Sequence, residues 1–132
     1  MRREFDLPPG DVEYLDARGF PWETIRQEGL WLLLHQYPIP PGYNYAQTSA
    51  ALSIPTGYAD AGIDMVYFHP HLALSNGRPI AASEHRQSID GKEWQRWSRH
   101  RTSQNPWRAG LDGVGTHLEM VDHWLSRELT KT

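Results

Sequence analysis

Three side chains near the middle of the chain have the types that a serine nucleophile site requires. Ser83 could supply a hydroxyl nucleophile, His85 a general base, and Asp90 a carboxylate that orients the base. A serine hydroxyl needs such a base because its own pKa lies far above neutrality, and His100 is a second candidate for that role. The glycine-flanked turn that exposes the serine in many hydrolases is missing from this segment. Catalysis and an ordinary polar loop therefore both stay open as interpretations of these residues.

The densest cluster of aromatic and basic side chains follows directly. It consists of Trp94, Arg96, Trp97, Arg99 and His100. If this stretch is helical, the two tryptophans, three apart, share one face, and Arg96 and His100, four apart, share another. Tryptophan and arginine dominate the energetics of protein interfaces, so the cluster is a candidate partner-binding surface. Burial in the core is the alternative for the indole rings, and we expect at least one of them to be buried.

The charge of the chain is distributed unevenly. Residues 78–108 contain seven Lys or Arg against three Asp or Glu, a charge of +4, whereas the whole chain carries −3. Segregation of this kind is typical of a surface that faces a partner. Arginines with interleaved aromatic rings would also suit nucleic acid, but the acidic balance and a pI of about 6.1 argue against that partner.

The chain contains no cysteine, which excludes disulfide bonds, thiol catalysis and cysteine-ligated zinc. His69 and His71 are candidates for a general base or for metal ligands. Pro70 between them interrupts any strand, and no third ligand follows at a spacing typical of metal sites. We therefore expect neither a metal site nor a cofactor.

Length and composition predict one domain over residues 1–132. The chain is 39% hydrophobic and 22% charged, which is ordinary for a globular protein of this size. The longest fully apolar stretch, residues 30–34, is far too short to span a membrane, and the start of the chain lacks the apolar region of a signal peptide. We expect a cytoplasmic protein with no membrane partner.

The periodicity of apolar residues predicts an α+β domain. Proline near the start and Gly19 at the end favour an opening helix over residues 8–19, and apolar residues at spacings of three and four predict a closing helix over residues 110–128. Between them we expect a four-stranded antiparallel meander and then, after Pro70, a long irregular segment. The expected strands are residues 22–27, 30–37, 47–54 and 63–68.

Three motifs lie in register with this order of elements. Residues 38–44 form a proline-rich loop, residues 54–58 contain Pro55 and Tyr58 as Pro-x-x-Tyr, and a strand then ends in His69-Pro70 ahead of the segment 90–100. In this combination the chain resembles the UBC fold of ubiquitin-conjugating enzymes, and more specifically their prokaryotic family E. The resemblance implies that His69 and Tyr58 are structural anchors of the loops. It also implies a bacterial ubiquitin-like system with activating-enzyme-like proteins, ubiquitin-like modifiers and metal-dependent deconjugating peptidases as potential partners.

The chain departs from that family pattern at the positions that conjugating enzymes use for catalysis. Conjugating enzymes have asparagine where this chain has His71, and their cysteine follows about eight residues later, where this chain has Pro79 and Ile80. Transfer through a thioester is therefore excluded for this chain alone. We expect a non-covalent partner of a ubiquitin-like protein or of its activating enzyme. The alternative is an enzyme that transfers the modifier through an oxyester or a histidine, and in either case His69 should lie beside the Trp94–His100 cluster.

Overall fold

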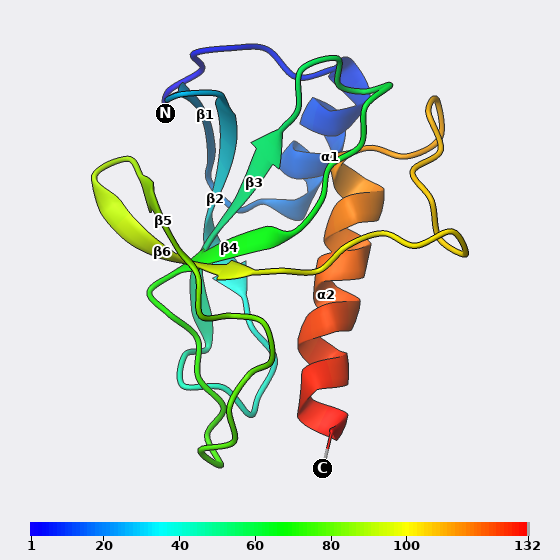
Figure 1. The fold of residues 1–132 in the computed structure, drawn as a ribbon. Coiled ribbons are helices and arrows are strands. Elements are labelled where there is room, and N and C mark those ends of the chain that lie inside the picture. The colour runs from blue at the N-terminus through cyan, green and yellow to red at the C-terminus, as the bar shows by residue number, and fades with distance from the viewer. Residues whose placement is uncertain (132) are drawn as a thin grey trace.

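The computed structural model describes residues 1–131, and within them the chain forms two helices and six strands. The elements are α1 (Pro9–Arg18), β1 (Trp22–Arg26), β2 (Leu30–Pro38), β3 (Gln47–Ile54), β4 (Val66–His69), β5 (Arg86–Ile89), β6 (Lys92–Trp97) and α2 (Val114–Thr130). The α+β class and the two expected helices are confirmed (Figure 1). None of the helices in this part of the chain is long and apolar enough to cross a membrane.

The six strands form one antiparallel sheet in the order β1-β2-β3-β4-β6-β5. The expected four-stranded meander is thus wrong in number, because a further hairpin, β5–β6, extends it beyond β4. The long irregular segment expected after Pro70 is therefore wrong in part, because strands β5 and β6 lie within it. Asp90 and Gly91 connect the hairpin with positive φ at both positions, 53° and 76°, as in the two-residue turns that match the twist of paired strands.

Strand β4 begins three residues later than predicted. Its ladder starts at Val66, opposite Trp97, whereas the apolar pattern pointed to Ile63. Met65 has a φ of 60°, and an extended strand does not pass through that conformation. Ile63 is nevertheless fully buried, so the apolar residue serves the core without belonging to the sheet.

Helix α2 covers one face of the sheet with its apolar stripe (Figure 1). The residues of the stripe recur at spacings of four and three, and each is at most 1% exposed. Burying an aliphatic side chain to this extent contributes about 1.5–3 kcal/mol. They pack into one cluster with the aromatic rings of Phe68 and Trp97, whose centroids are 5.3 Å apart. The stripe consists of Val114, Leu118, Val121 and Leu125.

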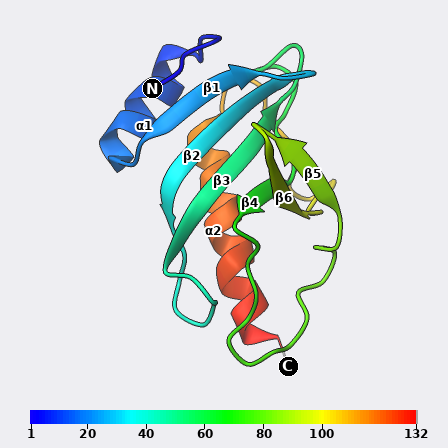
Figure 2. The same cartoon turned by 90° about the vertical axis from the view of Figure 1, so that its left-hand side faces the viewer.

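The opposite face of the sheet carries a second, smaller core that no helix covers (Figure 2). Trp31 and Tyr67 meet edge to face at 5.1 Å, and Trp94 and Ile89 are buried beside them. The side chain of Gln27 in the β1–β2 turn donates to the Ser88 carbonyl and so links the two edges of the curled sheet around these rings. The same amide accepts the Asp90 N–H, at the tip of the β5–β6 hairpin.

Helix α1 lies beside the amino-terminal end of α2 (Figure 1). It ends at Gly19, which adopts the left-handed conformation with a φ of 83° and donates its N–H to the Leu15 carbonyl. The helices approach closely at Gly115, where a Cβ atom would lie 2.9 Å from the ring of Tyr14. A larger residue at this position of α2 would therefore have to displace the Tyr14 ring.

Candidate functional site

His69, at the carboxyl end of β4, is held by two neighbouring strands. Its Nδ1 lies 2.9 Å from the carbonyl oxygen of Glu93 in β6 and donates to it, because a carbonyl can only accept. Its ring lies 5.5 Å from that of Trp94, and its own carbonyl accepts the hydroxyl of Thr48 in β3 at 2.6 Å. His69 thus lies beside the first residue of the tryptophan–arginine cluster, and these contacts tie three strands together where the chain leaves the sheet.

Two side-chain amides fix the backbone that follows. Gln95, which is 4% exposed, accepts the Leu72 N–H and donates to the Leu72 carbonyl, both at 3.0 Å. Asn44 accepts the Ala73 N–H at 2.9 Å and donates to the His71 carbonyl at 3.1 Å. Each amide replaces the partners that a missing strand would have offered. The irregular segment is therefore held against the sheet at a defined position.

The position expected for a nucleophile carries apolar side chains. Pro79 is exposed, and Ile80 is buried at 7% exposure. Ser83 follows three residues later, and its hydroxyl donates to the Ile80 carbonyl at 2.8 Å while the residue is 8% exposed. The hydroxyl hydrogen that a base would have to remove is therefore engaged in a local turn.

The three side chains expected to form a relay are not connected to one another. His85 is exposed, and within residues 1–131 its ring forms no hydrogen bond with Ser83 or Asp90. Both carboxylate oxygens of Asp90 accept from Arg2, at 2.9 and 2.6 Å. The hydrogen bonds from Arg2 lower the pKa of the Asp90 carboxyl. Asp90 is thus committed to the tip of the hairpin instead of orienting an imidazole.

The two tryptophans of the cluster are both buried, at 2% and 0% exposure. Because side chains alternate along a strand, Trp94 and Trp97, three apart in β6, point to opposite faces of the sheet and join different cores. Trp97 donates its indole N–H to Gln95, and Trp94 donates to the Ile89 carbonyl. Neither ring is presented to a partner, so only the basic residues of the cluster can form a contact surface.

The basic residues of the cluster lie along the end of β6 and the segment after it. Arg96 is half-buried and donates to the Ser98 hydroxyl at 3.2 Å. His100 is exposed, and its Nδ1 lies 2.7 Å from a carboxylate oxygen of Asp64. Arg99 lies over the Trp97 ring, 4.9 Å from its centroid, and donates to the Ala81 carbonyl at 2.9 Å. It thereby connects the cluster to the loop that contains the expected nucleophile position.

A buried carboxylate on α2 meets the same loop. Glu128 is 1% exposed and accepts the Ala81 N–H at 3.3 Å. Three basic side chains surround it, with nitrogen–oxygen distances of 3.6 Å for Arg78, 3.9 Å for Arg99 and 2.8 Å for Lys131. Burial raises the pKa of Glu128, but hydrogen bonds from Lys131 and Ala81 outweigh it, and the pKa is lowered overall. Glu128 is therefore an anion that attaches the loop to the end of α2.

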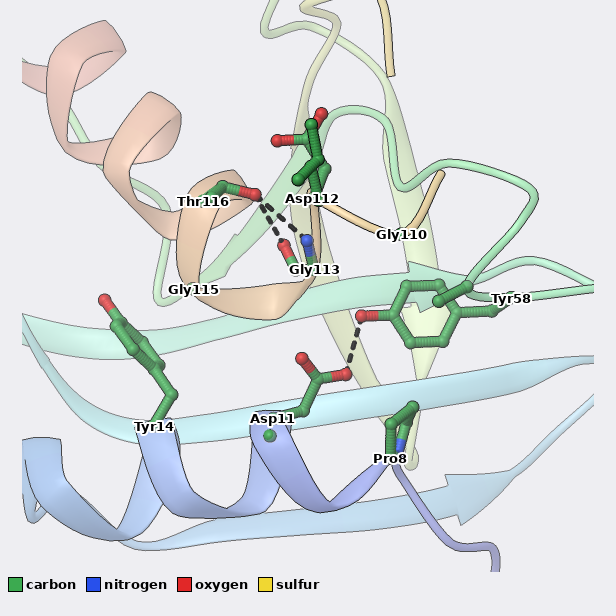
Figure 3. A pocket seen from close by; sticks show the side chains of 12 residues that line it. Pro8, Asp11, Tyr14, Tyr58, Gly110, Asp112, Gly113, Gly115 and Thr116 are labelled. Carbon is green, nitrogen blue, oxygen red and sulfur yellow. Dashed lines mark hydrogen bonds between the residues drawn. The ribbon is translucent and has the colours of Figure 1, made fainter. Parts of the chain in front are cut away.

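Tyr58, the tyrosine of the Pro-x-x-Tyr loop, lies at the other end of α2 (Figure 3). Its hydroxyl donates to Asp11 Oδ2 at 2.6 Å, and Asp11 Oδ1 accepts the Val114 N–H at 3.1 Å. Burial and the hydrogen bond to Asp11 raise the pKa of Tyr58. Asp11 thus caps α2 from another helix and anchors the loop at the same time.

A cavity of about 420 Å³ opens beside this cap. Its walls come from the start of α1, the Pro-x-x-Tyr loop and the first turn of α2, and much of its lining is glycine (Figure 3). Both oxygens of Asp11 and the hydroxyl of Tyr58 already have partners within the protein. Asp11 and Tyr58 therefore leave no free hydrogen-bonding group for a ligand in this cavity.

Four polar residues that organise the site escaped the sequence analysis. They share one property: their partners lie far away in the chain, 103 residues away for Asp11 and Val114 and 47 for Glu128 and Ala81. The only local hint is that a glutamate beside an apolar helix stripe is a candidate for burial. The four are Asp11, Asn44, Gln95 and Glu128.

The described part of the chain holds no group of three or more histidine, aspartate or glutamate side chains arranged as metal ligands. His71 lies 3.8 Å from Glu93, which gives a pair of side chains and no third ligand among residues 1–131. The site thus consists of two loop anchors, His69 and Tyr58, the basic side chains at the end of β6, and the ion pairs around the buried Glu128.

Comparison with known proteins agrees with the motifs on which the resemblance depended. The model of the family described as prokaryotic E2 family E matches residues 7–128. Searches of curated proteins and of solved structures gave no match. The family match extends from just before α1 into the last turn of α2, and it includes the His69 turn and the cysteine-free loop after it. The chain therefore belongs to prokaryotic E2 family E, a family of ubiquitin-conjugation-like systems, and it lacks the catalytic cysteine.

Proposed function

We propose that this protein acts as a non-covalent binding partner in a bacterial ubiquitin-like modification system. It would bind a ubiquitin-like protein or the activating enzyme of that protein. The supporting residues are the three basic side chains of the cluster, Arg96, Arg99 and His100, of which Arg99 contacts the loop of residues 71–83 through the Ala81 carbonyl. Arginine is among the residues that dominate interface energetics, and these basic side chains are what remains of the expected cluster once both tryptophans are buried.

One observation favours a binding role over transfer of the modifier by an enzyme. At the expected nucleophile position Ile80 is buried, and its carbonyl accepts a hydrogen bond from the Ser83 hydroxyl. Activating that hydroxyl would require the turn to break and a base to replace the carbonyl. A binding role requires no such rearrangement.

The test is to incubate the protein with the activating enzyme, ATP and the modifier, and to measure intact mass and binding on the same samples. We expect binding without a mass increase of the chain. Arg96→Gln should weaken binding by about tenfold, as for a charged hydrogen bond at an interface, whereas Lys92→Gln on the same strand, with the same change in charge, should not.

A base-labile adduct of the modifier would contradict the proposal. If that adduct disappeared in Ser83→Ala or His85→Ala, the oxyester alternative would be correct. Failure of both the modifier and the activating enzyme to bind would also reject the binding role.

A further inference from the structure

The carboxyl-terminal end of α2 carries more positive charge than its buried carboxylate can balance. A cavity of about 170 Å³ is bounded there by Trp124, Glu128, and the basic side chains of Arg99, Arg127 and Lys131, with His100 at its edge. Counting arginine and lysine against glutamate, the lining carries a charge of +2. Glu128 is directed toward Lys131 and the Ala81 N–H, so its charge is already used within the protein.

Buried guanidinium nitrogens near this cavity lack acceptors. Within residues 1–131, Nη2 of Arg99, which lines this cavity, is enclosed and forms no hydrogen bond, and the same holds for Nε of Arg78, which lies outside its lining and pairs with Glu128. The Glu128 oxygen closest to Arg99 Nη2 is 3.9 Å away, which is beyond hydrogen-bond reach. Buried donors of this kind are normally satisfied by protein, water or a bound ion. The cluster therefore has capacity for one more oxyanion.

The cavity adjoins the loop where a conjugating enzyme would hold its nucleophile. Arg99 donates to the Ala81 carbonyl, and Glu128 accepts the Ala81 N–H. A second cavity, of about 180 Å³, is lined by that loop and includes Arg78, Pro79 and Ile80. Arg78 also reaches the Glu128 side chain and backbone carbonyl, so one set of ion pairs borders both cavities. In Figure 2 the loop passes beside the carboxyl end of α2.

We propose that the cavity between Arg99, Arg127 and Lys131 binds the free α-carboxylate at the end of an extended polypeptide. This rests on the proposed function, because the polypeptide would be the tail of the ubiquitin-like partner. A thioester or an ester is uncharged at that carbon and gains nothing from the cations, whereas a carboxylate forms charge-assisted hydrogen bonds with arginine. The protein would thus select the modifier in its unactivated form.

The size of the cavity restricts the end of the tail. A volume of about 170 Å³ corresponds to five or six water molecules at about 30 Å³ each, well below the volume of a drug-sized pocket. It accepts a carboxylate with one or two residues as small as glycine. A nucleotide is too large, but inorganic phosphate would fit and presents similar chemistry.

The test is an NMR titration of the full chain with three probes: acetyl-Gly-Gly with a free carboxylate, the same dipeptide as its amide, and inorganic phosphate. We expect the acid to shift the resonances of residues around Ala81 and Lys131 and to bind at least tenfold more tightly than the amide. Arg127→Gln should weaken the acid by about tenfold. Arg127 is exposed and outside the ion pairs found in residues 1–131, so its replacement should leave the fold intact. Lys92→Gln is the control with the same charge change and should leave the affinity unchanged.

Equal binding of acid and amide would overturn the proposal, as would phosphate binding as tightly as the acid, which would indicate a site for any small anion. An intact modifier distinguishes the two levels of inference. If the modifier binds and removal of its last two residues does not weaken it, the carboxylate site is wrong and the binding function stands. If neither modifier nor activating enzyme binds while the acid still titrates at this cavity, the proposed function is wrong and the carboxylate site stands.

Discussion

Both ends of α2 are attached to a distant segment by a buried carboxylate, but the two carboxylates differ in the charge of the groups around them. At each end a buried carboxylate joins the helix to a distant segment: Asp11 at the amino-terminal end and Glu128 at the carboxyl-terminal end, 8% and 1% exposed. Asp11 meets two neutral donors, Tyr58 and the Val114 N–H, each on one of its oxygens. Its negative charge also suits the positive end of the helix dipole. Both carboxylate oxygens at the amino-terminal end therefore have a partner within the protein.

At the carboxyl-terminal end, by contrast, the basic side chains outnumber the carboxylate that they surround. A negative charge there opposes the helix dipole, so Glu128 needs cations, and the chain supplies three within 4 Å together with Arg127 nearby. On the proposal above, the amino-terminal end holds the fold, whereas the carboxyl-terminal end would both hold the fold and receive an anion.

The largest expected effect is on stability at the carboxyl-terminal end. Glu128→Gln keeps the shape and the acceptor for Ala81 but removes the charge between Arg78, Arg99 and Lys131. Removing one partner of a buried ion pair costs about 3–5 kcal/mol. Chemical denaturation should therefore show a free energy of unfolding lower by that amount.

Glu119→Gln is the matched control for this substitution. Glu119 lies on the same helix, is exposed, and forms no ion pair in the part of the chain that the structure describes. We expect it to change stability by less than about 0.5 kcal/mol. If the two variants unfolded alike, Glu128 would not attach the loop to α2.

A second effect comes from the buried histidine on the amino-terminal half of α2. His117 is fully buried, and burial lowers its pKa from 6.5 to about 4. Its Nε2 donates to the Met65 carbonyl at 2.8 Å, and Arg101 lies 3.2 Å from Nδ1. The unfolded chain takes up a proton below pH 6.5, whereas the folded chain does so only near pH 4. Stability due to His117 is therefore complete above pH 6.5, and about 3 kcal/mol of it is lost between pH 7 and pH 4.

Denaturation at several pH values measures this loss. His117→Gln should be less stable at pH 7 and show a smaller decline toward pH 4, because the titrating group is gone. A wild-type decline that persists unchanged in this variant would assign the pH dependence to other groups, such as the carboxylates paired with arginine.

Local patterns predicted much of the fold. The α2 stripe was predicted because apolar residues at helical spacing face one core, and Gly19 was predicted as a helix end because glycine accepts a positive φ. The β5–β6 hairpin was missed although Asp90-Gly91 is a strong turn signal. An irregular segment was expected there instead. The two tryptophans, three apart, would share one face of a helix, but the same spacing places them on opposite faces of a strand that is buried on both sides.

The candidate site was less predictable for a physical reason. His69 was found because its motif is contiguous, and the basic residues of the cluster because they lie close together in sequence. Glu128 and Asp11 act on segments that only the tertiary fold brings close, so no spacing rule applies to them. Ser83 shows the converse, since a hydroxyl that appeared available in sequence is engaged by the backbone of its own turn.

The smallest expected effect separates the two ends of α2 most cleanly. Tyr58→Phe removes the hydroxyl that donates to Asp11 and leaves one carboxylate oxygen without its protein partner, so unfolding should become easier by about 1–2 kcal/mol. Tyr45→Phe, at an exposed tyrosine, is the control and should be neutral. Because Tyr58 lies at the end of α2 remote from Arg127, its variant should bind acetyl-Gly-Gly with unchanged affinity, whereas Arg127→Gln should lose affinity with unchanged stability. If Tyr58→Phe weakened the dipeptide as well, the two ends of α2 would be coupled, and the separation of a structural end from a receptive end would be wrong.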